Sequence, residues 1–208
     1  SAPRPKQHEK TPTPILTTVP NAPIPYKIAC LCEIRDPQGR ILLLHRVKPP
    51  NRHLYSPIGG KLEQHTGESP TACAIREIHE EVGLALHPKD LALLGIISEN
   101  AYATSDAEKP NHWLMFWFRV LPPIDPARIP ESFDEGTLVW TNEQDLHNLP
   151  LPETDRTAIW PAVLQHSDNT PPGRPRLGFF ALYIDCTTKP PTSTLEQSSP
   201  PMLPPHHA

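Results

Sequence analysis

Residues 59–84, GGKLEQHTGESPTACAIREIHEEVGL, decide the fold of this chain. The second half of the stretch predicts one amphipathic helix. Ser69-Pro70 is typical of a helix start, where a capping hydroxyl precedes a proline at the first helical position, and Gly83 is typical of a helix end. Since successive helical residues turn by about 100°, Ile78 and Val82 fall on one face together with Ile75, and we expect that face to be buried.

The opposite face of the predicted helix carries Glu77, Glu80 and Glu81. Like charges at these spacings repel, and the last two lie near the helix C-terminus, where the helix dipole disfavours anions. A solvated charged face is the simple alternative, but a bound cation would offset both costs. Hard oxygen ligands of this kind suit Mg²⁺, with Mn²⁺ as a substitute. The pattern therefore predicts a metal site.

The complete stretch combines Gly59-Gly60, Glu68 and a nine-residue segment from Arg76 to Leu84 of the form R-E-U-x-E-E-x-G-U, where U is aliphatic. This combination resembles the signature box of the Nudix hydrolases, which cleave nucleoside diphosphates linked to another group. The resemblance implies an α/β fold, specifically an α/β/α sandwich with a mixed sheet and a loop-helix-loop catalytic motif. Predicted strands on both sides of a single glutamate-bearing helix agree with that layering.

The resemblance also implies roles for individual residues. Glu77, Glu80 and Glu81 match the metal-binding carboxylates of the family, and Glu80 or Glu81 also matches the base toward water. Arg76 and Glu68 match the charged pair that holds loop and helix together, a structural role that serves catalysis.

The loop before the helix departs from the family pattern. Gly59 and Gly60 match the glycines that let the backbone approach the helix. The family usually has five residues between the second glycine and the glutamate that Glu68 matches, whereas residues 61–67 number seven here. The helix itself is intact, so we expect metal binding to survive, and we expect His65 in the longer loop to be exposed.

Further candidate site residues lie on both sides of the box. Arg46, at the exit of a predicted strand, is a candidate phosphate contact, with a surface arginine as the alternative. The acidic loop after the box offers Glu131 or Glu135 as an additional metal ligand, with Glu131 as the candidate and a solvated loop charge as the alternative. The full set of predicted substrate contacts is Arg46, Gly59, Gly60, Lys61 and Tyr102.

Composition limits the other functions that the chain could have. The 208 residues include 30 prolines, about three times the usual share of roughly 5%. The formal charge of −4 and the lack of a basic run argue against polymeric nucleic acid as a partner. No apolar run is long enough for a membrane helix. The four cysteines show neither zinc nor secreted-framework spacing, which favours buried free thiols and a cytoplasmic location.

The chain order predicts one domain between two tails. Residues 1–25 and 188–208 are rich in proline and poor in apolar periodicity, so we expect a flexible arm and a disordered tail around a domain at 26–187. Residues 36–39 predict a turn that joins two strands into a hairpin. Predicted strands cover residues 26–35, 40–47, 91–102, 112–121, 137–140 and 177–186. Predicted helices cover residues 142–149 and 153–166, before the last of these strands.

The function that these residues favour is Mg²⁺-dependent pyrophosphohydrolysis of a small nucleotide. The segment before the box resembles the MutT-like branch, which implies an ordinary or oxidised nucleoside triphosphate that is cleaved to monophosphate and pyrophosphate. Tyr102 lies where the dinucleoside polyphosphate branch often has a tyrosine, so that substrate is the second choice. A nucleotide-binding sensor without turnover and a scaffold with proline-rich tails stay open, as does a homodimer.

Overall fold

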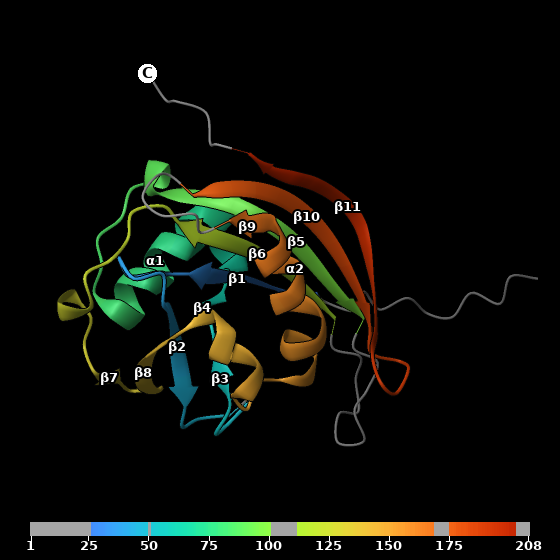
Figure 1. The fold of residues 1–208 in the computed structure, drawn as a ribbon, viewed down its shortest axis with the longest axis horizontal. Helices are drawn as coiled ribbons and strands as arrows, with labels where there is room; N and C mark the ends of the chain where they lie inside the picture. The colour runs from blue at the N-terminus through green and yellow to red at the C-terminus, as the bar shows by residue number, and fades with distance from the viewer. Residues whose placement is uncertain (1–25, 50, 101–111, 169–174, 203–208) are drawn as a thin grey trace, which may run out of the picture.

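The computed structural model describes residues 26–49, 51–100, 112–168 and 175–202 (Figure 1). The predicted arm at 1–25 and the candidate Tyr102 lie outside these ranges. Within them, two β-sheets and a few helices form a mixed α/β structure. No helix in the described part is long and apolar enough to cross a membrane.

The larger sheet has the strand order β11-β10-β5-β6-β1-β4, and the short strand β9 pairs with β10. The pairs β1–β6 and β10–β5 are parallel, whereas the other pairs are antiparallel, so the sheet is mixed as predicted. The apolar strand β6 lies inside the sheet between β5 and β1, as its continuous hydrophobic sequence indicates. The strands are β1 Lys27–Glu33, β4 Ile58–Lys61, β5 Leu91–Asn100, β6 Trp113–Val120, β9 Ser167–Asp168, β10 Arg176–Asp185 and β11 Thr192–Met202.

The smaller sheet has the order β3-β2-β8-β7, made of β3 Tyr55–Ser56, β2 Ile41–Arg46, β8 Gly136–Thr141 and β7 Ser132–Phe133. The predicted turn is present, since the Gly39 N–H donates to the Asp36 carbonyl at 2.9 Å. The predicted hairpin is wrong, however, because β1 and β2 join different sheets and meet only at a bridge between Arg35 and Ile41. Strand β2 divides two cores and is buried on both faces, as its apolar run predicts.

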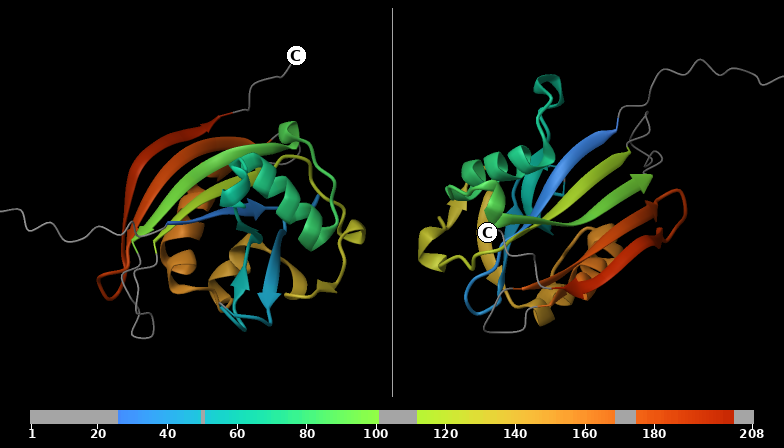
Figure 2. Two further views of the ribbon diagram at one scale, coloured as in Figure 1. Left: turned by 180° about the vertical axis from the view of Figure 1, so that it is seen from behind. Right: turned by 90° about the horizontal axis from the view of Figure 1, so that it is seen from above.

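Two helices cover opposite faces of the larger sheet. Helix α1 (Pro70–Val82) packs on β1 and β4, and helix α2 (Trp160–His166) packs on β10 and β5 (Figure 2). We call these the α1 face and the α2 face of the sheet. The α/β/α layering predicted from the sequence is therefore confirmed. Short 3₁₀ helices lie at η1 Gln64–Thr66, η2 Pro88–Asp90, η3 Pro126–Arg128 and η4 Glu143–Asn148.

The second predicted helix differs from an ordinary α-helix. Its first part, η5 (Asp155–Ile159), is a π-helix that runs directly into α2. Pro161 stands at the start of α2 and has no N–H to donate to the preceding turn. The proline therefore leaves one α-helical hydrogen bond unmade. The wider π-helical turn before it accommodates this gap.

The caps predicted for the box helix are present. The Ser69 hydroxyl accepts the Ala72 N–H at 3.2 Å, and Gly83 ends the helix in the left-handed region at φ 73°. Ile78 and Val82 are fully buried against the sheet. Local chemistry therefore fixes both ends of α1, and its apolar stripe fixes which face it buries.

The C-terminal segment contradicts one expectation. We predicted a disordered tail over residues 188–208, but β11 (Thr192–Met202) pairs antiparallel with β10 along the edge of the larger sheet. Its side chains are mostly exposed, so its sequence lacks the apolar alternation of a half-buried strand. Backbone pairing with β10, which has no signature in the sequence of β11 itself, decides the structure of this segment. The boundaries of the domain stay a prediction.

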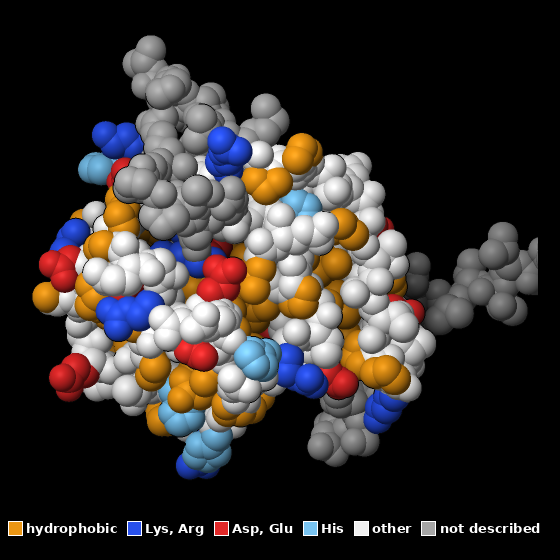
Figure 3. Space-filling view, viewed as in Figure 1, with side chains coloured by type: hydrophobic (Ala, Val, Ile, Leu, Met, Phe, Trp, Pro, Cys, Tyr) orange, Lys and Arg blue, Asp and Glu red, His pale blue; other side chains and the backbone are white. Residues whose placement is uncertain are grey.

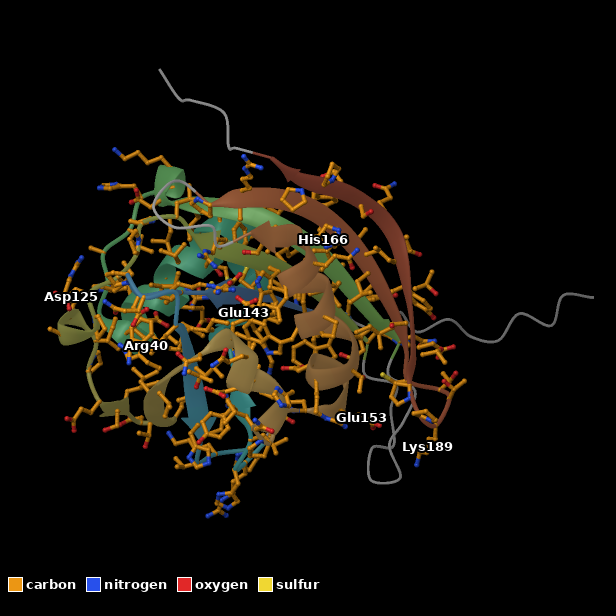
Figure 4. All side chains as sticks on the ribbon, in the orientation of Figure 1. Arg40, Asp125, Glu143, Glu153, His166 and Lys189 are labelled. Atoms are coloured by element: carbon orange, nitrogen blue, oxygen red, sulfur yellow. The ribbon has the colours of Figure 1, made fainter. Side chains whose placement is uncertain are left out.

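A buried ionic network ties β1 to β6 and to η4. Glu33 is completely buried and forms ion pairs with Arg35, at 2.6 Å, and with Arg119. Arg35 also forms an ion pair with Glu143 on η4 at 2.6 Å. Glu143 is labelled in Figure 4. Burial by itself would raise the pKa of Glu33, but the charges of Arg119 and Arg35 hold that pKa below its ordinary value. The network therefore depends on an ionised Glu33.

We predict that Glu33→Gln destabilises the fold by roughly 3–5 kcal/mol, because it leaves two buried arginines without their shared counter-charge. Urea unfolding followed by circular dichroism measures this change. Glu196→Gln, an exposed substitution on β11, is the control and should change stability by less than about 0.5 kcal/mol. Equal stability of the two variants would show that the network contributes little.

Candidate active site

Strand β4 brings the backbone of the glycine pair against helix α1. Gly59 and Gly60 pair with Leu31 and Cys30 of β1. A Cβ on Gly60 would overlap the carboxylate of Glu77, so only glycine leaves room for that side chain. Gly59 has φ 142°, a conformation that favours glycine, and a Cβ there would overlap the Cys30 carbonyl. Gly60 therefore makes room for the Glu77 carboxylate, whereas Gly59 allows β4 to pack closely against β1.

Arg76 connects the loop to the helix through one guanidinium group. It forms ion pairs with Glu68 at 2.9 Å, Glu77 at 2.8 Å and Glu80 at 3.1 Å. Its Nη2 also donates to the Lys61 carbonyl at 3.1 Å, directly after the glycine pair. The side chain thus fixes the relative positions of β4, the loop and the acidic face of α1.

Glu68 is strongly held in its ionised form. Hydrogen bonding from Arg76 lowers the pKa of Glu68 to about 2, and the Glu63 N–H adds a second donor at 2.9 Å. The longer loop is taken up by η1, which projects away from the body of the domain (Figure 2). His65 is exposed there, as predicted. The insertion therefore leaves the Arg76–Glu68 pair in place.

Glu81 is the most buried carboxyl group of the acidic face, with 8% of its surface exposed. Burial raises the pKa of Glu81 to about 8, while a hydrogen bond from the Gly59 N–H, at 3.1 Å, favours the charged form. The negative charges of Glu77 and Glu135 raise this pKa further. The positive charge of Arg46 lowers this pKa, but burial outweighs it.

The three box glutamates differ in their surroundings. Burial raises the pKa of Glu77 despite its contact with Arg76, whereas Glu80 is 56% exposed. Among the described residues, no three His, Cys, Asp or Glu side chains stand close enough together to hold a metal ion as they lie. An all-oxygen, partly exposed donor set suits Mg²⁺, which keeps waters and takes further ligands from substrate phosphates. Glu77 fills the room that Gly60 leaves, and its negative charge acts on Glu81, so the two crowded carboxyl groups fit such an ion.

An ion pair between strand β2 and the loop before β8 lies near Glu81. Arg46 and Glu135 lie 3.0 Å apart, and both charges act on the pKa of Glu81. Glu135 is therefore near the acidic face of α1. The favoured candidate Glu131 is exposed and contacts Leu138 through its backbone carbonyl. Its role as a metal ligand stays a prediction.

Lys61 lies on the α2 face of the sheet, since it alternates with Gly60 along β4. Its Nζ is 6.0 Å from the centre of the Trp113 ring, which is also approached by Lys27. Lys27 was not among the residues singled out from the sequence. Only the pairing of β1 with β6 brings it beside Trp113, and neither residue belongs to a motif.

The sequence also did not indicate a pair of carboxyl groups, Asp155 and Glu99, on the α2 face of the sheet. Asp155 begins η5, and Glu99 lies near the end of β5, where it accepts a hydrogen bond from the Cys186 thiol at 3.2 Å. Burial, and then the charge of Glu99, raise the pKa of Asp155 to about 7. Burial also raises the pKa of Glu99. These residues are far apart in sequence, so no spacing indicated the pair.

Comparison with known proteins identifies the family. The sequence profile of the NUDIX domain matches residues 25–160. The chain belongs to the Nudix hydrolases, a family of hydrolases that act on pyrophosphate bonds. An uncharacterized Nudix hydrolase of Bacillus subtilis, YvcI, is 32% identical over 128 residues, which cover 61% of this chain and 71% of the relative.

Solved structures show the same fold. A mutator MutT protein from Bacillus halodurans superposes with a TM-score of 0.56 at 24% identity, over 83% of this chain and 96% of that one. A MutT Nudix hydrolase from Burkholderia pseudomallei gives a TM-score of 0.50 at 25% identity, over 65% and 95% of the two chains. The Nudix-type fold predicted from the sequence is therefore confirmed.

We predict that alanine lowers activity at Gly60 and stability at Gly59. Gly60→Ala should lower kcat by roughly 100-fold, because the new methyl group displaces the Glu77 carboxylate, while the fold stays intact since a flexible side chain can move. Gly59→Ala should cost roughly 1–3 kcal/mol of stability, because its backbone conformation is strained for alanine. Thermal unfolding and hydrolysis rates measured on both proteins check this, and similar behaviour of the two variants would contradict it.

We also predict a pH effect from Asp155. Its folded pKa of about 7 lies above the ordinary value of 3.8, so the folded state binds the extra proton between these values. Stability is then lost as pH rises toward 7. Between about pH 5 and pH 8 the wild type should lose roughly 2–3 kcal/mol more than Asp155→Asn. Urea unfolding of both proteins tests this, and parallel pH profiles would contradict it.

Proposed function

We propose that this protein is an Mg²⁺-dependent pyrophosphohydrolase of small nucleotides, with a nucleoside triphosphate, ordinary or oxidised, as the leading substrate. The observation that carries the proposal is the acidic face of α1 at the glycine edge of β4. Glu77, Glu80 and Glu81 are all retained there, and Arg76 positions two of them. A nucleotide-binding sensor would not need this complete set.

Each residue has a distinct role in the proposed reaction. Glu77, Glu80 and Glu81 would hold Mg²⁺, which supplies charge neutralisation of the phosphates and a more acidic water. The Gly59 N–H keeps Glu81 oriented, and Arg76 keeps Glu77 and Glu80 on the same side of the helix. Catalysis would come from positioning rather than from a covalent intermediate.

Groups around the acidic face would bind the substrate and accept its proton. Glu80 or Glu81 would take a proton from the attacking water. Arg46, Lys61 and the backbone of the glycine pair would contact phosphate oxygens. Of the two loop carboxylates, Glu131 stays our predicted additional ligand, and Glu135 is the alternative because its charge already acts on Glu81. Tyr102 stays a predicted contact in the part of the chain that the structure does not describe.

The proposed location and partners follow the same reasoning. Cys30, Cys32 and Cys73 are buried free thiols, and Cys186 is a partly buried one, which supports a reducing compartment such as the cytoplasm. On the face shown in Figure 3, the described Lys and Arg side chains are scattered among acidic ones and form no broad basic patch. A small nucleotide therefore suits the surface better than a nucleic acid polymer. A homodimer stays a prediction.

A substrate panel with Mg²⁺ tests the function. It contains ordinary and oxidised nucleoside triphosphates, diadenosine polyphosphates, ADP-ribose and nucleotide sugars, with phosphate and pyrophosphate measured separately. We expect one class to be hydrolysed, and Glu80→Gln and Glu81→Gln each to lower kcat/KM at least about 100-fold. Glu63→Gln, an exposed change in the loop before α1, is the control and should keep full activity.

The products distinguish the branches of the family. Pyrophosphate from a triphosphate supports the leading substrate, whereas preferential turnover of diadenosine polyphosphates supports the second choice. Nucleotide binding without turnover on any member of the panel would overturn the enzyme and favour a sensor. Activity unchanged in both glutamine variants would overturn the assignment of the site.

A further inference from the structure

Two lysine ammonium groups approach one indole ring on the α2 face. The Nζ atoms of Lys27 and Lys61 lie 5.1 Å and 6.0 Å from the centre of the Trp113 ring. Lys27 stands directly beside Trp113 in the β1–β6 register, and Lys61 stands beside Ala29 in the β1–β4 register. Strands β1, β4 and β6 thus contribute one residue each: Lys27, Lys61 and Trp113. We call the two lysines the lysine pair.

Among the described residues, neither ammonium group of the lysine pair has a carboxylate within ion-pair distance. Lys27 and Trp113 are partly buried, so the charge of Lys27 is only partly hydrated. The face of an indole ring attracts a cation. A second cation on the same ring adds repulsion, and a bound anion would remove it. Two like charges over one ring are therefore a reason to look for an anionic ligand here.

The lysine pair lies across the sheet edge from the glutamates. Gly60 faces Glu77 on the α1 face, and the next residue, Lys61, points to the α2 face. Strand β4 is the last strand of the larger sheet, so its outer edge has no strand beside it in the described part. A phosphate chain that extends from the glutamates to Lys61 would pass around this edge, and Lys27 follows Lys61 on the α2 face.

Other groups near the lysine pair do not neutralise it. Glu99 flanks Trp113 on the side away from Lys27 and accepts a hydrogen bond from the Cys186 thiol. Burial raises the pKa of Glu99, and the hydrogen bond that it accepts comes from the Cys186 thiol and not from a lysine. Farther along this face, the charge of Glu99 acts on Asp155, whose pKa is also raised. The positive charge of the lysine pair is thus left available for a ligand.

We propose that Lys27 and Lys61 form a phosphate subsite over Trp113 that binds the substrate's phosphate beyond the two held at the box glutamates. The inference rests on the proposed function and narrows its substrate class. Molecules with three or more linked phosphates fill the subsite, whereas ADP-ribose and nucleotide sugars, with two phosphates, leave it empty. Nucleoside triphosphates and dinucleoside polyphosphates share this chemistry, and the panel separates them.

Base-free probes test the subsite directly. Imidodiphosphate and diimidotriphosphate differ by one phosphate, and their P–N–P bridges resist hydrolysis. With Mg²⁺, calorimetry should show that Lys27→Met and Lys61→Met weaken binding of the triphosphate probe about tenfold each, as expected for loss of a charged contact. Binding of the diphosphate probe should stay within about twofold. Lys27→Arg should retain most of the affinity, and Lys89→Met, an exposed lysine on η2, is the control.

Kinetics give a second measurement. For a nucleoside triphosphate, Lys27→Met should raise KM about tenfold, and any two-phosphate substrate that is turned over should keep its KM. Equal weakening of both probes, or no preference of the wild type for the longer probe, would overturn the subsite. Lysine-dependent binding without turnover on any panel member would keep the subsite and overturn the hydrolase. If triphosphates are turned over and the lysine variants have unchanged KM, the hydrolase is kept and the subsite is overturned.

Discussion

The guanidinium group of Arg76 is the interaction on which the proposed site depends. It contacts Glu68 and the Lys61 carbonyl on the loop side, and Glu77 and Glu80 on the helix side. One rigid, permanently charged fork can satisfy these partners together, which a flexible lysine could not. The longer loop is tolerated for the same reason. Its additional residues lie in η1, outside the segment that the Arg76–Glu68 pair closes.

Strand β4 divides two surfaces of opposite charge. On the α1 face, the missing side chain of Gly60 makes room for a carboxylate, and on the α2 face Lys61 adds a cation one residue later. This alternation follows directly from the pleat of a strand. An anionic substrate held by a cation on one side and by the lysine pair on the other would straddle the edge of the sheet. The inferred substrate class follows from that arrangement.

Sequence reasoning succeeded where the interaction is local and failed where it is distant. The caps of α1 depend on Ser69 and Gly83 themselves and were predictable. The Arg76–Glu68 pair was expected from the resemblance of the box to the family pattern, and the structure contains it. The separation of β1 and β2 into two sheets was not predictable, because the turn between them permits either arrangement. Nor was β11, which forms by backbone pairing with β10 despite an exposed, proline-containing sequence.

The sequence by itself determined the box, the fold family and the acidic face of α1, because those depend on residue types at fixed spacings along one helix. Only the tertiary structure decided which distant groups join them. Strand register places Lys27 beside Trp113, and the loop after β7 brings Glu135 toward Glu81. The network around Glu33 likewise joins residues that are more than a hundred positions apart, from Arg35 to Glu143. Such contacts depend on how strands pair in space, which neighbouring residues in the chain do not specify.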